Sequence, residues 1–354
     1  MTGPRIVPID RAGDAGADRL GGKGASLARL CAAGLRVPPG FVVTTPAYRH
    51  AVLGAIGDAL DAALADVPPD APADELDAAA AGVRALVAAV DPDAALADEI
   101  RAAYDALGGA DAGVAVAVRS SSAAEDSAEH SFAGEHDTYL WVCGADEVLA
   151  RVRDCWASLF TTRAMEYRRA AGLAAAGDAM AVVVQEMVPA RAAGVFMTLN
   201  PENGDRSKVA VESVWGLGEP LVSGAVTPDG FHLDKVTGEV VHRSVVDKPT
   251  ELVRAPHGVG TATADVAADR RRSPSLTDGE LAELLRLARL VERHFGCPQD
   301  GEFAIGPGSA PDNVYLVQSR PETVWSRRAV TKASTGASLM DSILSHLVPK
   351  RDTT

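Results

Sequence analysis

Basic residues beside glycines or hydroxyl groups are the first candidates for chemistry in this chain. Lys23 lies in the stretch GGKG, residues 21–24, directly before a helical pattern. Glycines let a backbone approach a ligand closely, and an ammonium group at a helix start can reach a phosphate. The stretch is not a Walker A loop, because the spacing G-x-x-x-x-G-K-[ST] is missing. A phosphate site and a plain glycine turn both fit it.

A second basic residue, Arg119, ends an apolar stretch that predicts a buried strand over residues 113–119 and is followed by three serines. A planar guanidinium beside hydroxyl groups suits polyphosphate oxygens. The alternative is a structural ion pair with Glu125 or Asp126. Further on, a loop is predicted to close over phosphates through its backbone N–H groups, with a phenyl ring that excludes water: Ser131, Phe132, Ala133 and Gly134.

Oxygen ligands gather near the end of the chain. Asp300, Glu302 and Gln318 fall on two neighbouring predicted strands, and such a set holds Mg²⁺ together with nucleotide phosphates. Arg320 comes two residues after Gln318, so it shares the same strand face and can touch an outermost phosphate. The alternative is that these acids are simply solvated strand-edge residues.

Two more segments allow a functional and a structural interpretation. The turn WGLGE ends in Glu219, which either orients a lysine, a metal or a phosphoryl group or merely caps the turn. The apolar strand VVVQEMV, residues 182–188, is typical of a core strand. Its backbone from Glu186 to Val188 is also suited to read an adenine edge while Met187 packs on the ring.

Length and composition limit the classes of protein. The 354 residues suggest two domains or one bilobal unit, and the charge sum, 34 − 48 = −14, argues against wrapping nucleic acid. Four scattered cysteines form neither a zinc motif nor a disulfide framework. The sequence has no leader pattern and no apolar stretch of membrane-spanning length. We therefore expect a cytoplasmic protein without membrane or nucleic-acid partners.

Hydrophobic periodicity predicts an α+β protein with strands and helices in both halves. Helices are expected at 24–33, in three segments between 45 and 107, at 146–171 and at 276–295. Strands are expected at 37–44, 113–119, 138–142, 180–188, 302–305 and 314–318, with further strands and glycine turns from residue 191 onward. Residues 245–275, which include three successive arginines, are predicted to be an exposed loop.

Taken in order, these segments resemble the N-terminal ATP-binding region of the dikinases that use phosphoenolpyruvate, over about residues 18–326. The resemblance rests on GGKGASL, VAVRSSSAAEDS, SFAGEHDTYL, VVVQEMV, AGVFMT, WGLGEPLVSGAVTPD, the acids at 300 and 302, and VQSRPET. Phosphoenolpyruvate synthase, pyruvate phosphate dikinase and rifampin phosphotransferase share this region. It implies an ATP-grasp-type bilobal fold with ATP between an N-terminal lobe, 1–190, and a C-terminal lobe, 191–330, followed by a mobile tail, 331–354.

The resemblance also implies a role for each matching residue. Lys23 and Arg119 would bind phosphates under the SFAG loop. Adenine would lie against the strand end that comprises Gln185, Glu186, Met187 and Val188. Mg²⁺ and the polyphosphate would be positioned by Glu219, Asp300, Glu302 and Gln318, while Arg320 would stabilise charge on the transferred group. One departure is Glu135, where the family more often has glutamine, and its role stays open.

In this family the group leaving ATP passes to a histidine on a swivelling domain. None of the eight histidines here has the Thr-rich, glycine-flanked context of that motif, although His130 neighbours the SFAG loop. The chain therefore resembles phenylphosphate synthase, in which these parts are separate polypeptides. This implies a nucleotide-binding subunit of a split dikinase: it transfers a phosphoryl or pyrophosphoryl group from Mg·ATP to a histidine on a separate partner protein. The final acceptor would be a small phenol-like hydroxyl compound or an enol such as that of pyruvate, with AMP and phosphate as products. A non-catalytic ATP-sensing module and an ATP-grasp ligase are the alternatives.

Overall fold

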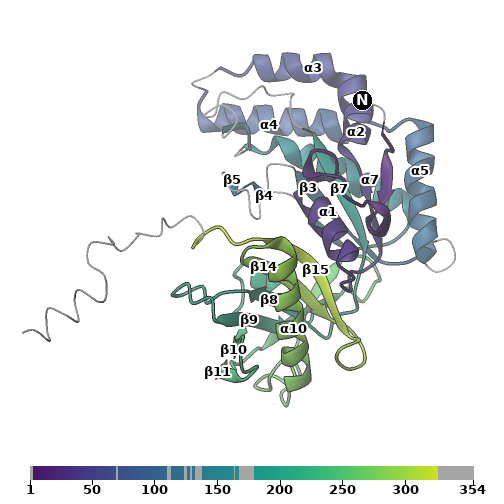
Figure 1. Ribbon diagram of the computed structural model, residues 1–354. Coiled ribbons are helices and arrows are strands. Elements are labelled where there is room, and N and C mark those ends of the chain that lie inside the picture. Colours follow the sequence, from purple (N-terminus) through teal and green to yellow (C-terminus); the bar gives the residue numbers. More distant parts are fainter. Residues whose placement is uncertain are drawn as a thin grey trace, which may run out of the picture. The chain divides into compact units, whose positions relative to one another are not determined.

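The computed structural model describes residues 3–68, 71–109, 113–122, 126–127, 130–131, 138–162, 164–166 and 179–325 (Figure 1). Its first compact unit ends at Glu322, and the features below belong to it. The predicted tail, residues 331–354, lies outside the described residues. The strands of this unit form two large antiparallel sheets and two hairpins.

The first large sheet has five strands and is buried on both faces. Its order is β1 (Ile6–Pro8), β2 (Gly40–Val43), β7 (Met180–Glu186), β3 (Val116–Ser122) and β6 (Thr138–Val142). Alternate residues of β7 belong to two different core clusters: Val182 and Val184 to one, Ala181 and Val183 to the other. A strand covered on both faces reads as a continuous apolar run, which is why this segment was recognisable in the sequence.

Helices surround the five-stranded sheet. Its helices are α1 (Ala17–Ala32), α2 (Thr45–Tyr48), α3 (Gly54–Ala65), α4 (Ala73–Ala88), α5 (Ala94–Tyr104) and α7 (Ala145–Ala157). The cluster with Val182 contains buried residues of α2, α4, α5 and α7, whereas α1 contributes Leu27 and Leu30 to the other cluster. The two faces of the sheet therefore have different helical partners.

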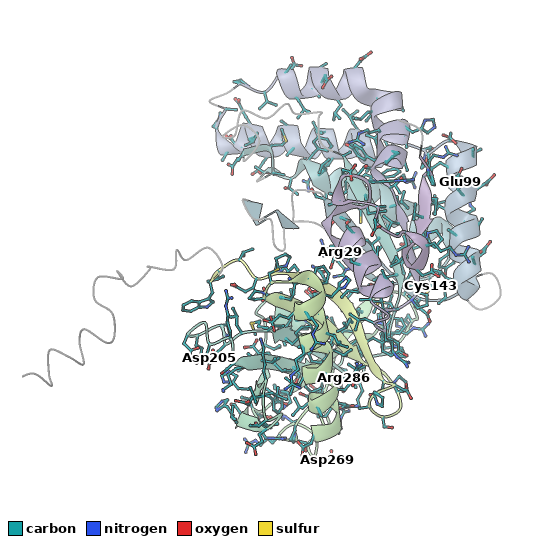
Figure 2. All side chains as sticks on the ribbon, viewed as in Figure 1. Arg29, Glu99, Cys143, Asp205, Asp269 and Arg286 are labelled. Atoms are coloured by element: carbon teal, nitrogen blue, oxygen red, sulfur yellow. The ribbon has the colours of Figure 1, made fainter. Side chains whose placement is uncertain are left out.

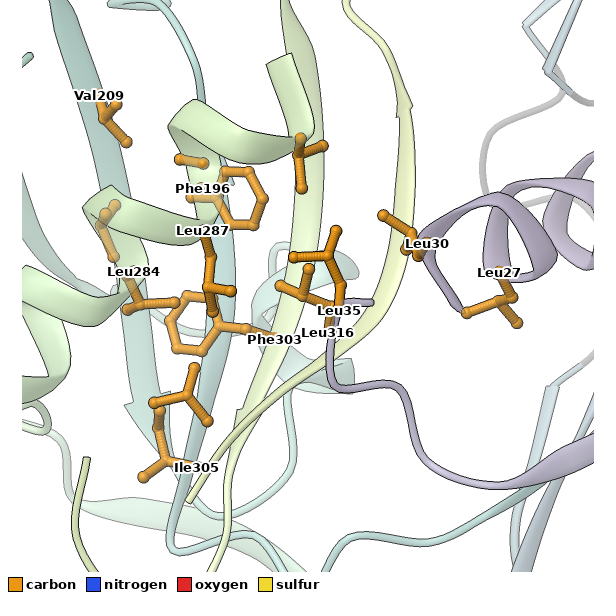
Figure 3. Close-up of a cluster of buried hydrophobic side chains, with 14 of the residues drawn as sticks. Leu27, Leu30, Leu35, Phe196, Val209, Leu284, Leu287, Phe303, Ile305 and Leu316 are labelled. Carbon is orange, nitrogen blue, oxygen red and sulfur yellow. The ribbon is translucent and has the colours of Figure 1, made fainter. Parts of the chain in front are cut away.

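The second large sheet has six strands, and one of its faces is covered by α10 (Asp278–Phe295). Its order is β11 (Val240–Ser244), β10 (Asp229–Asp234), β9 (Lys208–Trp215), β8 (Ala192–Met197), β14 (Gln299–Ile305) and β15 (Val314–Pro321). Leu284 and Leu287 of α10 share a cluster with Phe196 and Phe303 of the sheet (Figure 3). Leu27 and Leu30 of α1 belong to the same cluster, so a continuous apolar core joins α1 to this sheet.

Two ionic clusters, each with a buried carboxylate, hold the six-stranded sheet to its surroundings. Arg191 Nη2 donates to both carboxylate oxygens of Glu280, at 2.7 and 2.8 Å, and Glu280 completes a capping box with Thr277 at the start of α10. Lys248 Nζ lies 2.6 Å from Asp229 Oδ1, and both side chains are almost fully buried. Two backbone amides and the Ser275 hydroxyl also donate to Asp229, so both oxygens of this buried carboxylate accept hydrogen bonds.

The α+β class is confirmed, and so is the helix predicted at 276–295, which the structure has as α10 with a capping box at Thr277. The limits of the two lobes stay a prediction, although the strands of one sheet precede residue 190 and those of the other follow it. The prediction that Arg119 ends its strand is wrong, because β3 continues to Ser122. The prediction of a loop at 245–275 is also wrong, because β12 (Thr250–Arg254) and β13 (Thr261–Asp265) pair there. Neither strand has a buried residue, so the hairpin gave no core signal in the sequence.

Charged side chains such as Glu99, Asp269 and Arg286 are exposed at the periphery (Figure 2). Two of the three successive arginines, Arg271 and Arg272, pair with Asp247, so the run is partly neutralised locally. No helix in the described part of the chain is long and apolar enough to cross a membrane.

Candidate functional site

A cavity of about 510 Å³ is lined by residues of both large sheets, within the size range of small-molecule sites. All candidate residues whose side chains the structure describes line it: Lys23, Arg119, Gln185, Glu186, Met187, Val188, Glu219, Asp300, Glu302, Gln318 and Arg320. Ser131 belongs to the short strand β5 (His130–Ser131), which pairs with β4 (Asp126–Ser127). Phe132, Ala133, Gly134 and Glu135 lie outside the described residues. The structure thus brings the described candidates together, while their roles stay predictions.

The glycine turn in α1 is locked onto the end of β3. Gly21 has φ +69°, and a Cβ there would lie 1.9 Å from the Ser121 carbonyl oxygen, so only glycine fits. The Ser121 hydroxyl donates to Leu20 O at 2.9 Å and accepts from Gly24 N at 3.1 Å. This serine therefore fixes the turn, and its hydroxyl is engaged within the protein instead of being turned to a ligand.

Lys23 follows two residues after this turn and is buried in the cavity wall. Its Nζ donates to the Ser120 carbonyl at 2.9 Å, with 8% of the residue exposed. The locked turn and the strand carbonyl together fix the position of the ammonium group. A fixed cation is what recognition of a phosphate requires.

Arg119 links the two large sheets. Its Nη1 donates to Val317 O at 2.9 Å, and its Nη2 donates to Gln318 Oε1 at 2.6 Å and to Glu302 Oε2 at 3.2 Å. The side chain is 11% exposed. The ion pair in the structure is thus with Glu302. The local alternatives, Glu125 and Asp126, have no described side chains.

The strands predicted to be neighbours, β14 and β15, pair antiparallel. Asp300 faces Arg320, and Glu302 faces Gln318. Arg320 Nε lies 3.6 Å from Asp300 Oδ2. Burial raises the pKa of Asp300, and Arg320 opposes that rise. A Cβ on Gly301 would lie 2.1 Å from the buried Phe196 ring. The β14 backbone between the two acids therefore packs directly against the core.

The donor set of these strands fits a hard cation. It comprises two carboxylates and one amide oxygen, without sulfur or imidazole. Among the described residues no group of three His, Cys, Asp or Glu side chains could form a complete protein cage. Magnesium is usually held by one or two carboxylates plus substrate phosphates, so Asp300, Glu302 and Gln318 suit Mg²⁺ in combination with a polyphosphate.

At the other end of the cavity β7 leads into a connecting segment. Glu186 N donates to Pro39 O at 2.8 Å and Met187 N to Ala115 O at 2.9 Å. In the part of the chain that the structure covers, no acceptor is bonded to the amide of Val188. The Gln185 side chain is buried and donates to Pro38 O at 3.3 Å, which anchors the strand. Val188 thus offers a backbone donor in an apolar surrounding, as a purine ring nitrogen needs.

Glu219 begins the short helix α9 (Glu219–Val222) and is exposed at the cavity. The preceding turn has Gly216 at φ +72°, where a Cβ would lie 2.3 Å from Leu252 O. Leu217 N donates to the same oxygen at 2.9 Å. Strand β12 therefore supports this turn. The contact was not predicted, because residues 245–275 were expected to form a loop.

The chain matches the family description "Pyruvate phosphate dikinase, AMP/ATP-binding domain" over residues 17–340. It is 44% identical to the prodigiosin synthesizing transferase PigC of Serratia marcescens, over 86% of this chain and 32% of that protein. It is 42% identical to a rifampicin phosphotransferase of a Streptomyces species, over 91% and 36%. It is 38% identical to the phosphoenolpyruvate synthase of Aeropyrum pernix, over 87% and 41%. The chain thus spans about a third to two fifths of the length of these relatives.

The match agrees with the geometry, since cations, oxygen ligands and a free backbone donor share one cavity between two sheets in an α+β fold of the ATP-grasp type. The resemblance seen in the sequence is confirmed: the chain belongs to the AMP/ATP-binding domain family of the pyruvate phosphate dikinases.

Proposed function

We propose that this chain binds Mg·ATP in the cavity and transfers a phosphoryl or pyrophosphoryl group to a histidine on a separate partner protein. The observation that carries the proposal is the convergence of Lys23, Arg119 and Arg320 with the acids of β14 in one cavity. In a phosphoryl transfer the protein need not form a covalent bond itself, because positioning and charge stabilisation lower the barrier.

The two ends of the cavity suit the two ends of ATP. The Val188 amide and the Met187 side chain would hold adenine. Lys23 and Arg119 would bind the phosphates, and Glu219 would help to position the polyphosphate. Asp300, Glu302 and Gln318 would hold Mg²⁺, which neutralises phosphate charge. Arg320 would stabilise the charge that develops on the transferred group.

The nucleophile of the transfer step is the imidazole of the partner's histidine. An imidazole nitrogen forms a bond to a phosphorus of ATP, and the bond from that phosphorus to the leaving nucleotide oxygen breaks with its electron pair. Attack on the β-phosphorus releases AMP, after which water removes one phosphate and the acceptor takes the other. Of the histidines with described side chains, none lines the cavity, which supports a nucleophile from a partner.

The names of the relatives support the acceptor class. One is called a rifampicin phosphotransferase and another a phosphoenolpyruvate synthase. A small hydroxyl compound, phenol-like, or an enol such as that of pyruvate is therefore the proposed final acceptor. The ATP-sensing module and the ATP-grasp ligase are distinguished by product: a sensor leaves ATP intact, and a ligase releases ADP.

The test mixes the chain with Mg²⁺, β- or γ-labelled ATP and a neighbouring gene's histidine-domain protein. Label should appear on that protein together with AMP, and Arg320→Ala should abolish it. Arg36→Ala is the matched control, because Arg36 makes an exposed pair with Asp312 and is not among the residues that line the cavity. Label on this chain itself, or ADP with an acyl phosphate, would contradict the proposal.

A further inference from the structure

The hairpin β12–β13 is bonded to both large sheets and belongs to neither. Its strands pair from Thr250 with Asp265 to Arg254 with Thr261. It is an independent two-stranded sheet. A small polar hairpin has no core of its own, so its contacts with its neighbours decide its position.

The first strand of the hairpin, β12, holds the turn before Glu219. Leu252 makes a parallel bridge with Gly216, and the Leu252 carbonyl accepts from Leu217 N at 2.9 Å. The approach is so close that a Cβ on Gly216 would lie 2.3 Å from that carbonyl oxygen. Any displacement of β12 therefore moves the turn, and Glu219 two residues beyond it.

Its tip holds the edge strand β6. Gly260 N donates to Trp141 O at 3.1 Å, and the Arg254 guanidinium lies 5.4 Å from the Trp141 ring centroid. Arg254 Nη2 also donates to Gly258 O at 3.2 Å, which fastens the tip. Cys143, labelled in Figure 2, lies beside it with its Sγ 3.9 Å from the same Gly258 oxygen.

Trp141 has an unusual backbone at this contact. Its φ is +55°, and no other non-glycine among the described residues has a positive φ. The pairing of β3 with β6 shifts here, since Val116 faces Val142 but Val118 faces Tyr139. Such a bulge turns a backbone group out of the ladder. Here the Trp141 carbonyl accepts a hydrogen bond from Gly260 of the hairpin. Strained residues persist where their surroundings hold them, and they gather at functional sites.

We propose that Trp141 and Arg254 are positioning residues that act through the hairpin on Glu219. Thr138 and Leu140 of β6 line the cavity on one side, and Leu217 and Glu219 line it on the other. The hairpin joins these two walls, so Glu219 takes its place only while Trp141 holds the tip. This inference rests on the proposed function of the cavity and concerns its metal–polyphosphate end, not the adenine end at Val188.

The test compares Arg254→Ala with Arg243→Ala. Arg243 of β11 lies 5.4 Å from the Phe231 ring, so the control removes a cation–π contact of equal length that does not touch the hairpin. Arg254→Ala should weaken Mg·ATP binding about two- to fivefold, the value of an exposed cation–π contact, and leave magnesium-free AMP binding unchanged. Arg254→Lys should restore part of the loss, because it keeps the cation. Arg243→Ala should change neither affinity.

Hydrogen exchange without nucleotide separates this inference from the proposed function. Arg254→Ala should speed exchange in the peptide that contains Leu217 and Glu219, and Arg243→Ala should not. If that peptide is unchanged, or if Mg·ATP and AMP affinities fall equally, the positioning role is overturned. If the exchange responds but the unaltered chain binds no nucleotide, the linkage stands and the proposed function fails.

Discussion

Replacing Gly21 by alanine should separate the locked glycine turn from an ordinary one. Gly21 and Gly34 both have a positive φ, +69° and +71°, but Gly21 also has ψ 172°, a combination essentially restricted to glycine. A Cβ at Gly34 meets nothing within 4 Å, whereas one at Gly21 would lie 1.9 Å from Ser121 O. Gly34→Ala therefore measures the cost of a positive φ in open space, and Gly21→Ala adds a ψ that alanine avoids and the collision with β3.

The magnitudes differ enough to measure. A left-handed alanine costs about 1–2 kcal/mol, offset by about 0.4–1 kcal/mol because alanine restricts the unfolded chain. Gly34→Ala should thus lower the free energy of unfolding by about 1 kcal/mol. Gly21→Ala should cost about 4–6 kcal/mol, because overpacking adds about 1–3 kcal/mol and the two hydrogen bonds of Ser121 add about 1 kcal/mol each to the cost of the positive φ.

Urea unfolding and titration calorimetry together test this reasoning. Under conditions where both variants are folded, Gly21→Ala should weaken Mg·ATP binding at least about tenfold, because Lys23 shifts with the turn. Gly34→Ala should bind as the unaltered chain does. Equal losses of stability in the two variants would refute the collision, and normal binding by Gly21→Ala would refute the link from the turn to Lys23.

Three more substitutions test the supports of the site. Burial raises the pKa of Glu280, but its hydrogen bonds outweigh burial and hold it below the ordinary 4.5. Its stabilisation is therefore present above pH 4.5 and lost as the pH falls through the folded pKa, so Glu280→Gln should flatten urea stability against pH in that acid range. Lys248→Met should cost about 3–5 kcal/mol of unfolding free energy, because it leaves the buried Asp229 carboxyl without its ammonium partner; a loss below about 1 kcal/mol would contradict this. Gly301→Ala should cost about 1–3 kcal/mol through contact with Phe196 and weaken Mg·ATP binding; calorimetry showing unchanged affinity would mean that β14 adapts.

Motifs predicted which residues would meet, but not what holds them. Strand periodicity predicted that Gln318 and Arg320 share one face of their strand, whereas the pairing of Asp300 with Arg320 and of Glu302 with Gln318 comes from the register of β14 and β15. The partner of Arg119 did not follow, since Glu302 lies 183 residues away. The hairpin was missed because its strands bury no apolar face. The three serines after Arg119 were predicted to suit polyphosphate oxygens together with it, and the sequence did not show that the Ser121 hydroxyl is bonded to Leu20 and Gly24.

The charges in the cavity bear on how metal and nucleotide would enter. Arg119 and Arg320 lie against Glu302 and Asp300, so the two acids are already compensated by two cations. If these acids hold Mg²⁺ as proposed, the metal alone would meet both guanidinium groups, and like charges at such distances repel. A bound triphosphate would remove that conflict, because it would attract the arginines away from the acids while it binds the metal. Arg119 also joins the two sheets, so its transfer from Glu302 to a phosphate would change the contact between them. Metal and nucleotide are therefore expected to bind as a unit, and the move of one guanidinium would couple their binding to the closure of the cavity.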